Sequence, residues 1–198
     1  MHDLYLTSNI PPSVNHYLSY RAIVRNGKPL AVSYKPKEVV EYRESFAEYV
    51  SNEVANQGYD YQHDGKQHFY VDAVFYMPRV DMDANNYWKV LLDAITDTQL
   101  VWKDDNVVCE RVQAIYYDSS NPRVELHIYP TGYIGIFGSE KEHQEFIEKC
   151  KMCNRYKRNC SILRKAEDGQ IQEDICDGGC QKYKQRKQGG SEHGRTES

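Results

Sequence analysis

The alternation of apolar and polar residues along the chain predicts its strands. It is clearest at 68–77, where every second residue is apolar, as in a strand with one buried face. Apolar runs at 4–8, 107–117 and 123–129 predict three further strands. The last two are joined by 118–122, whose Asp, Ser, Asn and Pro residues are typical of a turn.

Two stretches carry apolar residues at helical spacing. In 38–56 apolar residues recur every three to four positions, and Gly58 ends the pattern. A second apolar stripe at i, i+3, i+4 and i+7 predicts a helix that begins near 85, with Asn85 or Asn86 as a natural N-cap. The stripe consists of Trp88, Leu91, Leu92 and Ile95. The segment before the first helix, 9–36, is predicted to be loop-rich or a hairpin. Together these elements predict an α+β domain with a small mixed β-sheet and two main helices.

Acidic and amide side chains gather around the start of the second predicted helix. Asp81 and Asp83 precede it, Asn85 opens it, and Asp104 and Asp105 follow it. Carboxylates at this density repel one another unless a cation lies among them, and Mg²⁺ prefers oxygen ligands. Water bound to Mg²⁺ is a nucleophile for phosphodiester hydrolysis. The segment therefore predicts a Mg²⁺ site.

The same segment resembles a known family. Asp83-Ala84-Asn85-Asn86 followed by Lys89, then Asp93-Ala94 and Asp104-Asp105, resembles the signature of the RusA-type Holliday-junction resolvases. Pro11-Pro12-Ser13-Val14-Asn15 resembles the N-terminal turn of that family. The resemblance covers residues 1 to 130. It implies a Mg²⁺-dependent endonuclease that resolves four-way DNA junctions as a homodimer, in DNA recombination and repair.

The resemblance also implies roles for individual residues. Asp83 and Asp105 would be the primary Mg²⁺ ligands, and Lys89 would stabilise charge on the phosphate. The assisting ligands would be Asp81, Asn85 and Asp104. The predicted catalytic set is Asp83, Asn85, Lys89 and Asp105.

The chain departs from the family pattern at Asn85, where the family has a second Asp. Asn offers one neutral oxygen, so the site loses a unit of charge. Asp81 could compensate as an extra ligand, or a two-residue insertion could make Asp81-Met82-Asp83 the Asp pair. The alternative hypothesis is a weakened or inactive protein that binds branched DNA and carries a zinc-stabilised tail.

The formal net charge of −4 argues against generic DNA binding, but it permits local contacts. Basic residues gather in 21–37 and in the tail. The predicted DNA-binding residues are Arg21, Arg25, Lys28, Arg79 and Lys89. No apolar run approaches the roughly 18 residues of a membrane span, and the first residues do not resemble a signal peptide. We therefore expect a cytoplasmic protein without a membrane partner.

Composition changes after Tyr129. A short acidic helix is predicted at 138–148, with Ser139 as its N-cap. Five of the six cysteines follow the start of that helix, and in a cytoplasmic chain this density favours zinc over disulfides. The predicted Zn²⁺ ligands are Cys150, Cys153, Cys160 and Cys176, with Cys180 as a substitute. Cys109 falls in a predicted strand, where we expect it to be buried.

The sequence thus predicts three parts. Residues 1–132 form the RusA-like domain, 133–183 a small cysteine-rich module that binds zinc, and 184–198 a disordered tail. A further hypothesis makes the cysteine-rich module a zinc-dependent adaptor for a partner, with the first domain as its scaffold.

Overall fold

A computed structural model describes residues 3–60 and 67–186, and the chain divides into two compact units between Thr131 and Gly132. Of the segment predicted to be disordered, only 184–186 lies within the described residues. None of the described helices has both the length and the apolar character needed to cross a membrane.

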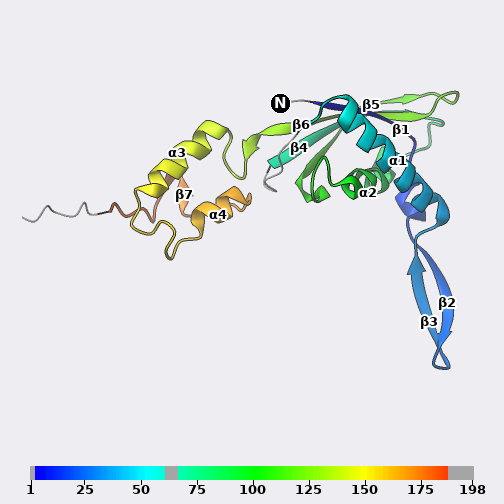
Figure 1. Cartoon of the computed structure of the whole chain (residues 1–198), viewed down its shortest axis with the longest axis horizontal. Helices are drawn as coiled ribbons and strands as arrows, with labels where there is room; N and C mark the ends of the chain where they lie inside the picture. Colours follow the sequence, from blue (N-terminus) through cyan, green and yellow to red (C-terminus); the bar gives the residue numbers. More distant parts are fainter. Residues whose placement is uncertain (1–2, 61–66, 187–198) are drawn as a thin grey trace, which may run out of the picture. The chain divides into compact units, whose positions relative to one another are not determined.

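The first unit is built on a four-stranded sheet with the strand order β1-β6-β4-β5 (Figure 1). β1 (Leu4–Asn9) pairs antiparallel with β6 (Arg123–Ile134), and β4 (Gln67–Met77) pairs parallel with β5 (Val108–Tyr117). The prediction of a mixed sheet is therefore confirmed. The predicted turn at 118–122 joins β5 to β6, which are not neighbours because β4 lies between them.

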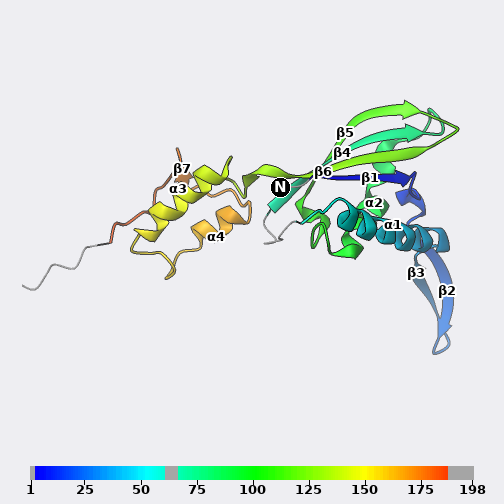
Figure 2. The same ribbon diagram turned by 45° about the horizontal axis from the view of Figure 1, so that its top comes forward.

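Two helices cover one face of this sheet (Figure 2). They are α1 (Lys37–Asn56) and α2 (Trp88–Thr98), and they pack on each other. α2 connects β4 to the parallel strand β5, because parallel strands need a crossover connection rather than a tight turn. Both predicted helices and the α+β class are confirmed.

The core of the first unit lies between the sheet and the helices. The five apolar positions that alternate along β4 are all buried, as are the four residues of the apolar stripe on α2. Leu4, Leu6 and Ile128 of the flanking strands and Trp102 join them. Full burial of one large apolar side chain contributes about 1.5–3 kcal/mol, so this contiguous cluster is the main source of stability for the unit.

The prediction that Asn85 or Asn86 caps α2 is wrong. A 3-10 turn, η2 (Ala84–Asn86), precedes the helix, and Tyr87 occupies the N-cap position of α2 without a side-chain hydrogen bond. Asp83 caps η2 instead, since its Oδ1 accepts the backbone N–H of Asn85 at 3.0 Å. Short Asp side chains bond readily to amides two residues on, which favours such a turn over a direct helix start.

Residues 9–36 contain a hairpin, one of the two predicted alternatives. η1 (Val14–His16), capped by Ser13, leads into β2 (Ser19–Arg25) and β3 (Lys28–Tyr34). Asn26 and Gly27 make the connection at φ values of 54° and 72°, as a two-residue hairpin turn requires. Both views draw the hairpin as an arm that extends away from the sheet (Figures 1 and 2). We call β2 and β3 with their turn the arm.

The second unit is small. It contains α3 (Glu140–Lys151), α4 (Ile162–Glu167) and a short pairing of β7 (Ile175–Cys176) with β8 (Gly179–Cys180). The predicted acidic helix is confirmed, and Ser139 caps it by accepting the N–H of Glu142 at 3.2 Å. Among its described residues, one buried cluster consists of Phe137, Phe146 and Ala166, and Cys153 and Ile162 are buried as well.

Candidate functional site

We call residues 79–105 the acidic segment. Its carboxylates lie around the N-terminal part of α2. Asp83 caps η2, which runs directly into the helix. After α2 the chain forms η3 (Asp105–Val107), which contacts both α2 and β4. Asp104 caps η3 by accepting the N–H of Asn106 at 3.0 Å. The fold thus brings two separate pieces of the acidic segment to the same helix.

Lys89 links these pieces. Its Nζ lies 2.8 Å from Oδ1 of Asp93, one turn further along α2, and 3.4 Å from Oδ2 of Asp105. Lys89 and Asp105, two members of the predicted catalytic set, are therefore in contact. The Lys89 side chain is 49% exposed, so its ammonium group can also reach a ligand from solvent.

Asp93 is held from two further elements. The hydroxyl of Tyr17, directly after η1, donates to Oδ2 of Asp93 at 2.5 Å, and Nη1 of Arg43 on α1 lies 3.4 Å from the same oxygen. Arg43 also binds Asp97 through two of its nitrogens. Sequence reasoning quoted Asp93 in the motif but gave it no role. It missed Tyr17 and Arg43, because nothing in their local sequence marks them as partners of α2.

The protonation of Lys89 and Asp93 follows from these contacts. The hydrogen bond to Asp93 raises the pKa of Lys89, burial opposes that rise, and the charges of Asp93 and Asp105 add to it. Burial alone would raise the pKa of Asp93, but hydrogen bonds from Lys89 and Tyr17 and the charges of Lys89 and Arg43 lower it. Lys89 is therefore a cation at neutral pH and Asp93 an anion, so Lys89 can bind phosphate but cannot accept a proton.

A second carboxylate lies close to Asp105. Burial raises the pKa of Glu110 on β5, and the negative charge of Asp105 raises it further. Two like charges in proximity are relieved by a cation between them. Sequence reasoning missed Glu110. The available signal was an acidic residue at the start of the strand that follows Asp105.

Asp81, Asp83 and Asn85 are exposed at the entrance to α2. Asp81 forms an exposed ion pair with Arg79, with 3.2 Å between Oδ1 and Nε. Exposed pairs of this kind contribute little to stability, so both side chains can rearrange around a ligand. The charges of Arg79, Asp81 and Asp83 all act on the buried phenol of Tyr87, which places the three side chains in the same neighbourhood.

The acidic segment offers oxygen donors to a divalent metal ion, but they do not yet form a closed site. Within 3–60 and 67–186, no three His, Cys, Asp or Glu side chains surround a common point closely enough to hold a metal as they stand. The chemistry nevertheless fits a hard cation. Asp83 and Asp104 use only Oδ1 in capping, and Asp105 meets Lys89 only at 3.4 Å. Mg²⁺ commonly binds one or two carboxylates and keeps several waters, which suits this arrangement.

The predicted DNA-binding residues fall into two groups. Arg21, Arg25 and Lys28 lie on the arm, where Arg21 sits 5.7 Å from the centroid of the Tyr34 ring. Arg79 and Lys89 lie in the acidic segment described above.

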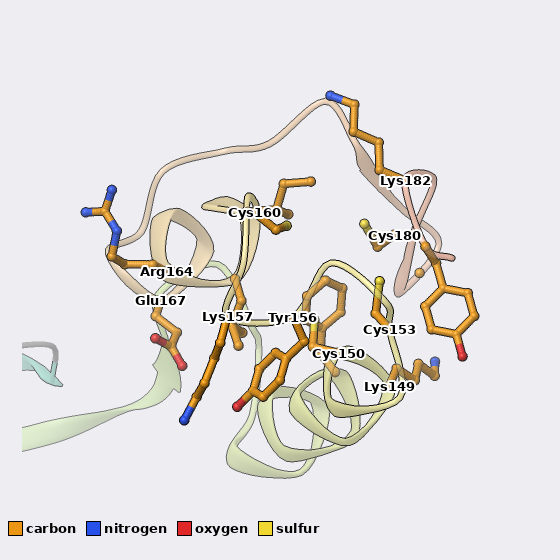
Figure 3. A pocket seen from close by; sticks show the side chains of 15 residues that line it. Lys149, Cys150, Cys153, Tyr156, Lys157, Cys160, Arg164, Glu167, Cys180 and Lys182 are labelled. Carbon is orange, nitrogen blue, oxygen red and sulfur yellow. The ribbon is translucent and has the colours of Figure 1, made fainter. Parts of the chain in front are cut away.

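The predicted zinc ligands lie in the second unit, and three of them line a pocket of about 520 Å³ (Figure 3). Cys150, Cys153 and Cys160 line it, and so does Cys180, the predicted substitute. Cys176 is exposed and does not line this pocket. Cys109 lies on β5 and is half-buried rather than buried as expected.

Comparison with known protein families finds a match. The model of the family described as Endodeoxyribonuclease RusA matches residues 10–129. The matched range is more than half of the chain and contains the whole acidic segment and the arm. Comparison with curated proteins finds no match.

Proposed function

Because the chain belongs to the RusA endodeoxyribonuclease family, we propose that it resolves four-way DNA junctions by Mg²⁺-dependent hydrolysis of phosphodiester bonds. The proposal includes action as a homodimer, since two active sites related by a twofold axis suit a substrate with the same symmetry. The observation that carries it is the contact of Lys89 with both Asp93 and Asp105, inside the range that the family model matches.

The carboxylates divide into two roles in this proposal. Asp83 and Asp105 would hold the metal, with Asp81, Asn85 and Asp104 assisting. When bound, Mg²⁺ would polarise the phosphate and lower the pKa of a water molecule. Glu110 is added as an assisting carboxylate, because the negative charge of Asp105 acts on it.

Lys89 would neutralise charge that develops on the phosphate. A preorganised cation is more effective than a mobile one, because no reorganisation is needed as charge develops. Asp93 supplies that preorganisation by binding Nζ at 2.8 Å, and Tyr17 and Arg43 fix Asp93. Lys89 is thus the phosphate-binding residue, and the other three position it.

The arm would contact DNA beyond the scissile phosphate. Arg21, Arg25 and Lys28 give it positive charge, and Tyr20 is 72% exposed on β2, so it can stack on an unpaired base. Binding through lysine and arginine releases counterions from DNA, so junction affinity should fall steeply as salt rises.

The direct test is incubation of the purified protein with a labelled synthetic four-way junction, in Mg²⁺ or in EDTA. A linear duplex of matching sequence is the substrate control. Paired symmetric nicks in the junction alone, and only with Mg²⁺, are the expected result. Cleavage of both substrates at equal rates would refute junction specificity, and cleavage in EDTA would refute the metal requirement.

The central variant is Asp105→Asn, which keeps the shape of the side chain and removes its charge. Cutting should fall by at least about a hundredfold while junction binding in a gel-shift assay remains, because a primary metal ligand is lost. Asp118→Asn is the matched control, since the Asp118 carboxylate accepts hydrogen bonds from Ser120 in the turn between β5 and β6. Unchanged cutting by Asp105→Asn would remove Asp105 from the site.

Asn85 separates an active enzyme from an inactive DNA-binding protein. If the natural chain binds junctions without cutting them, Asn85→Asp should restore cutting, because it returns the missing negative charge to the entrance of α2. If the natural chain cuts, the same change should alter the metal concentration needed for half-maximal rate. Failure of Asn85→Asp to cut would indicate that the loss of activity has another cause.

A further inference from the structure

One pocket of the second unit collects cysteines from three separate segments of the chain. Cys150 lies in the last turn of α3, Cys153 directly after it, Cys160 before α4, and Cys180 in β8 (Figure 3). We call these four residues the cysteine pocket. All six cysteines belong to the described residues, and none forms a disulfide.

The four thiols share one lining. Cys153 is buried, and Cys150, Cys160 and Cys180 are half-buried. Thiolates gathered on one lining repel one another, and a divalent cation among them stabilises every thiolate that binds it.

The backbone around Cys153 is already arranged for a thiolate. The N–H of Lys184 points at Sγ of Cys153, with 3.4 Å between the two atoms. A neutral amide that donates to a sulfur in this way compensates its negative charge without competing for a metal.

The other two cysteines of the chain lie elsewhere. Sγ of Cys176 lies 3.5 Å from the carbonyl oxygen of Glu173 and 3.3 Å from Nε2 of Gln181, at an exposed position. Cys109 is on β5 of the first unit. The fold thus selects Cys180, rather than Cys176, as the fourth sulfur near the Cys-x-x-Cys pair.

We infer that the cysteine pocket binds one structural Zn²⁺ ion through its four sulfurs. Four thiolates in a tetrahedron are a standard zinc site, and soft sulfur ligands select zinc over Mg²⁺. Each thiol releases one proton as it binds. The bound site carries a net negative charge, and the pocket is rimmed by Lys149, Lys157 and Lys182, which offset it.

Binding requires the thiols to turn inward. No three of them yet surround a common point at metal-binding distance among the described residues. Zn–S bonds are about 2.3 Å long, so the segments that carry Cys160 and Cys180 must close on α3. Those segments lack a large apolar core, which leaves the closure to the metal.

The experiment uses the full chain, purified without chelator and with thiols reduced. Metal content is measured by plasma mass spectrometry, and the ligands by X-ray absorption at the zinc edge. We expect one zinc per chain with four sulfur neighbours at about 2.3 Å. A folded protein without zinc, a site with mixed nitrogen and oxygen ligands, or iron in place of zinc would each overturn the inference.

Single serine variants then identify the sulfurs. Cys160→Ser and Cys180→Ser should lose most of the zinc, whereas the matched controls Cys176→Ser and Cys109→Ser should keep one ion per chain. Loss of zinc in Cys176→Ser, or full retention in Cys180→Ser, would overturn this ligand set. The two controls and the absorption spectrum of the natural chain remain decisive even if the pocket variants do not fold. None of these outcomes depends on junction cleavage.

Discussion

The two units of the chain hold themselves together by different means. In the first unit more than twenty buried residues form one contiguous apolar cluster between the sheet and two helices. Among the described residues of the second unit the corresponding cluster has three buried members, and cysteines line a cavity of this unit. A core of the first kind is stable without a ligand, whereas a small domain with little core usually needs a disulfide or a metal. The difference predicts that the chain combines a self-sufficient fold with one that depends on a ligand.

Removal of zinc should unfold the second unit and leave the first unit folded. This is the largest of the expected effects. A structural zinc site contributes on the order of 10 kcal/mol to folding, far more than the small cluster around Phe146. Hydrogen exchange with and without a chelator measures this. Amides of α3 should lose their protection, while amides of β4 keep theirs.

The fluorescence of Trp88 and Trp102 gives an independent control for this experiment. Both tryptophans of the chain lie in the first unit, and both are buried. Their emission should not change on chelation, and addition of Zn²⁺ should restore the protection of α3. Protected α3 amides in zinc-free protein would show that the second unit folds without metal.

The first unit should instead be vulnerable at its core. Phe75 on β4 is fully buried and contacts the rings of Tyr87 and Trp88. Phe75→Ala should lower the free energy of unfolding by about 3–5 kcal/mol, because it removes apolar contacts and leaves a cavity. Urea unfolding followed by tryptophan fluorescence measures it.

Tyr20→Ala is the matched control, since Tyr20 is 72% exposed on the arm. It should change the free energy of unfolding by no more than about 0.5 kcal/mol. Equal losses in both variants would contradict the assignment of stability to the core of the first unit.

The same division decides how well the sequence predicts each unit. Strict alternation along β4 and the stripe on α2 identify their elements, because one face of each must be buried against the core. For 9–36 the sequence predicts either a loop-rich stretch or a hairpin, although Asn26-Gly27 is a strong local signal for a two-residue turn. In the second unit α4, β7 and β8 were not predicted, since such short elements carry almost no periodicity.

The candidate sites show a similar limit. Lys89 and Asp105, which the fold brings into contact, are visible in sequence because they lie within one segment. Tyr17 and Arg43 are not, because their partner Asp93 is reached only through the tertiary fold. Among the cysteines, the sequence-based prediction favoured Cys176 with Cys180 as a substitute, whereas the pairing of β7 with β8 places Cys180 beside the pocket. Local chemistry is readable from sequence, but the choice between distant partners depends on packing.

A rigid first unit should also present Lys89 in a fixed position before substrate binds. Tyr17→Phe removes the hydroxyl that donates to Asp93 and leaves the ring in place. We expect the single-turnover rate constant of junction cleavage to fall about tenfold with little change in junction binding, since one hydrogen bond to a charged group is lost. Single-turnover cleavage and gel-shift titration measure the two quantities separately.

Tyr49→Phe provides the matched control for that experiment. Its hydroxyl accepts the N–H of Thr7 at 3.1 Å, away from the acidic segment. It should cost some stability and leave the cleavage rate unchanged. If both variants cut at the natural rate, Asp93 does not depend on Tyr17 for its position.

The smallest expected effect distinguishes the contribution of helix capping to the stability of the second unit from that of the proposed zinc ion. Ser139→Ala removes the hydroxyl that caps α3 and should destabilise the unit by about 1 kcal/mol with zinc bound. Ser161→Ala is the matched control, because Ser161 occupies the N-cap of α4 without a side-chain capping bond and its loss should cost little. Hydrogen exchange of α3 and α4 amides in the zinc-loaded protein measures both. If Ser139→Ala released zinc as fully as Cys160→Ser, helix capping rather than the metal would determine whether the second unit folds.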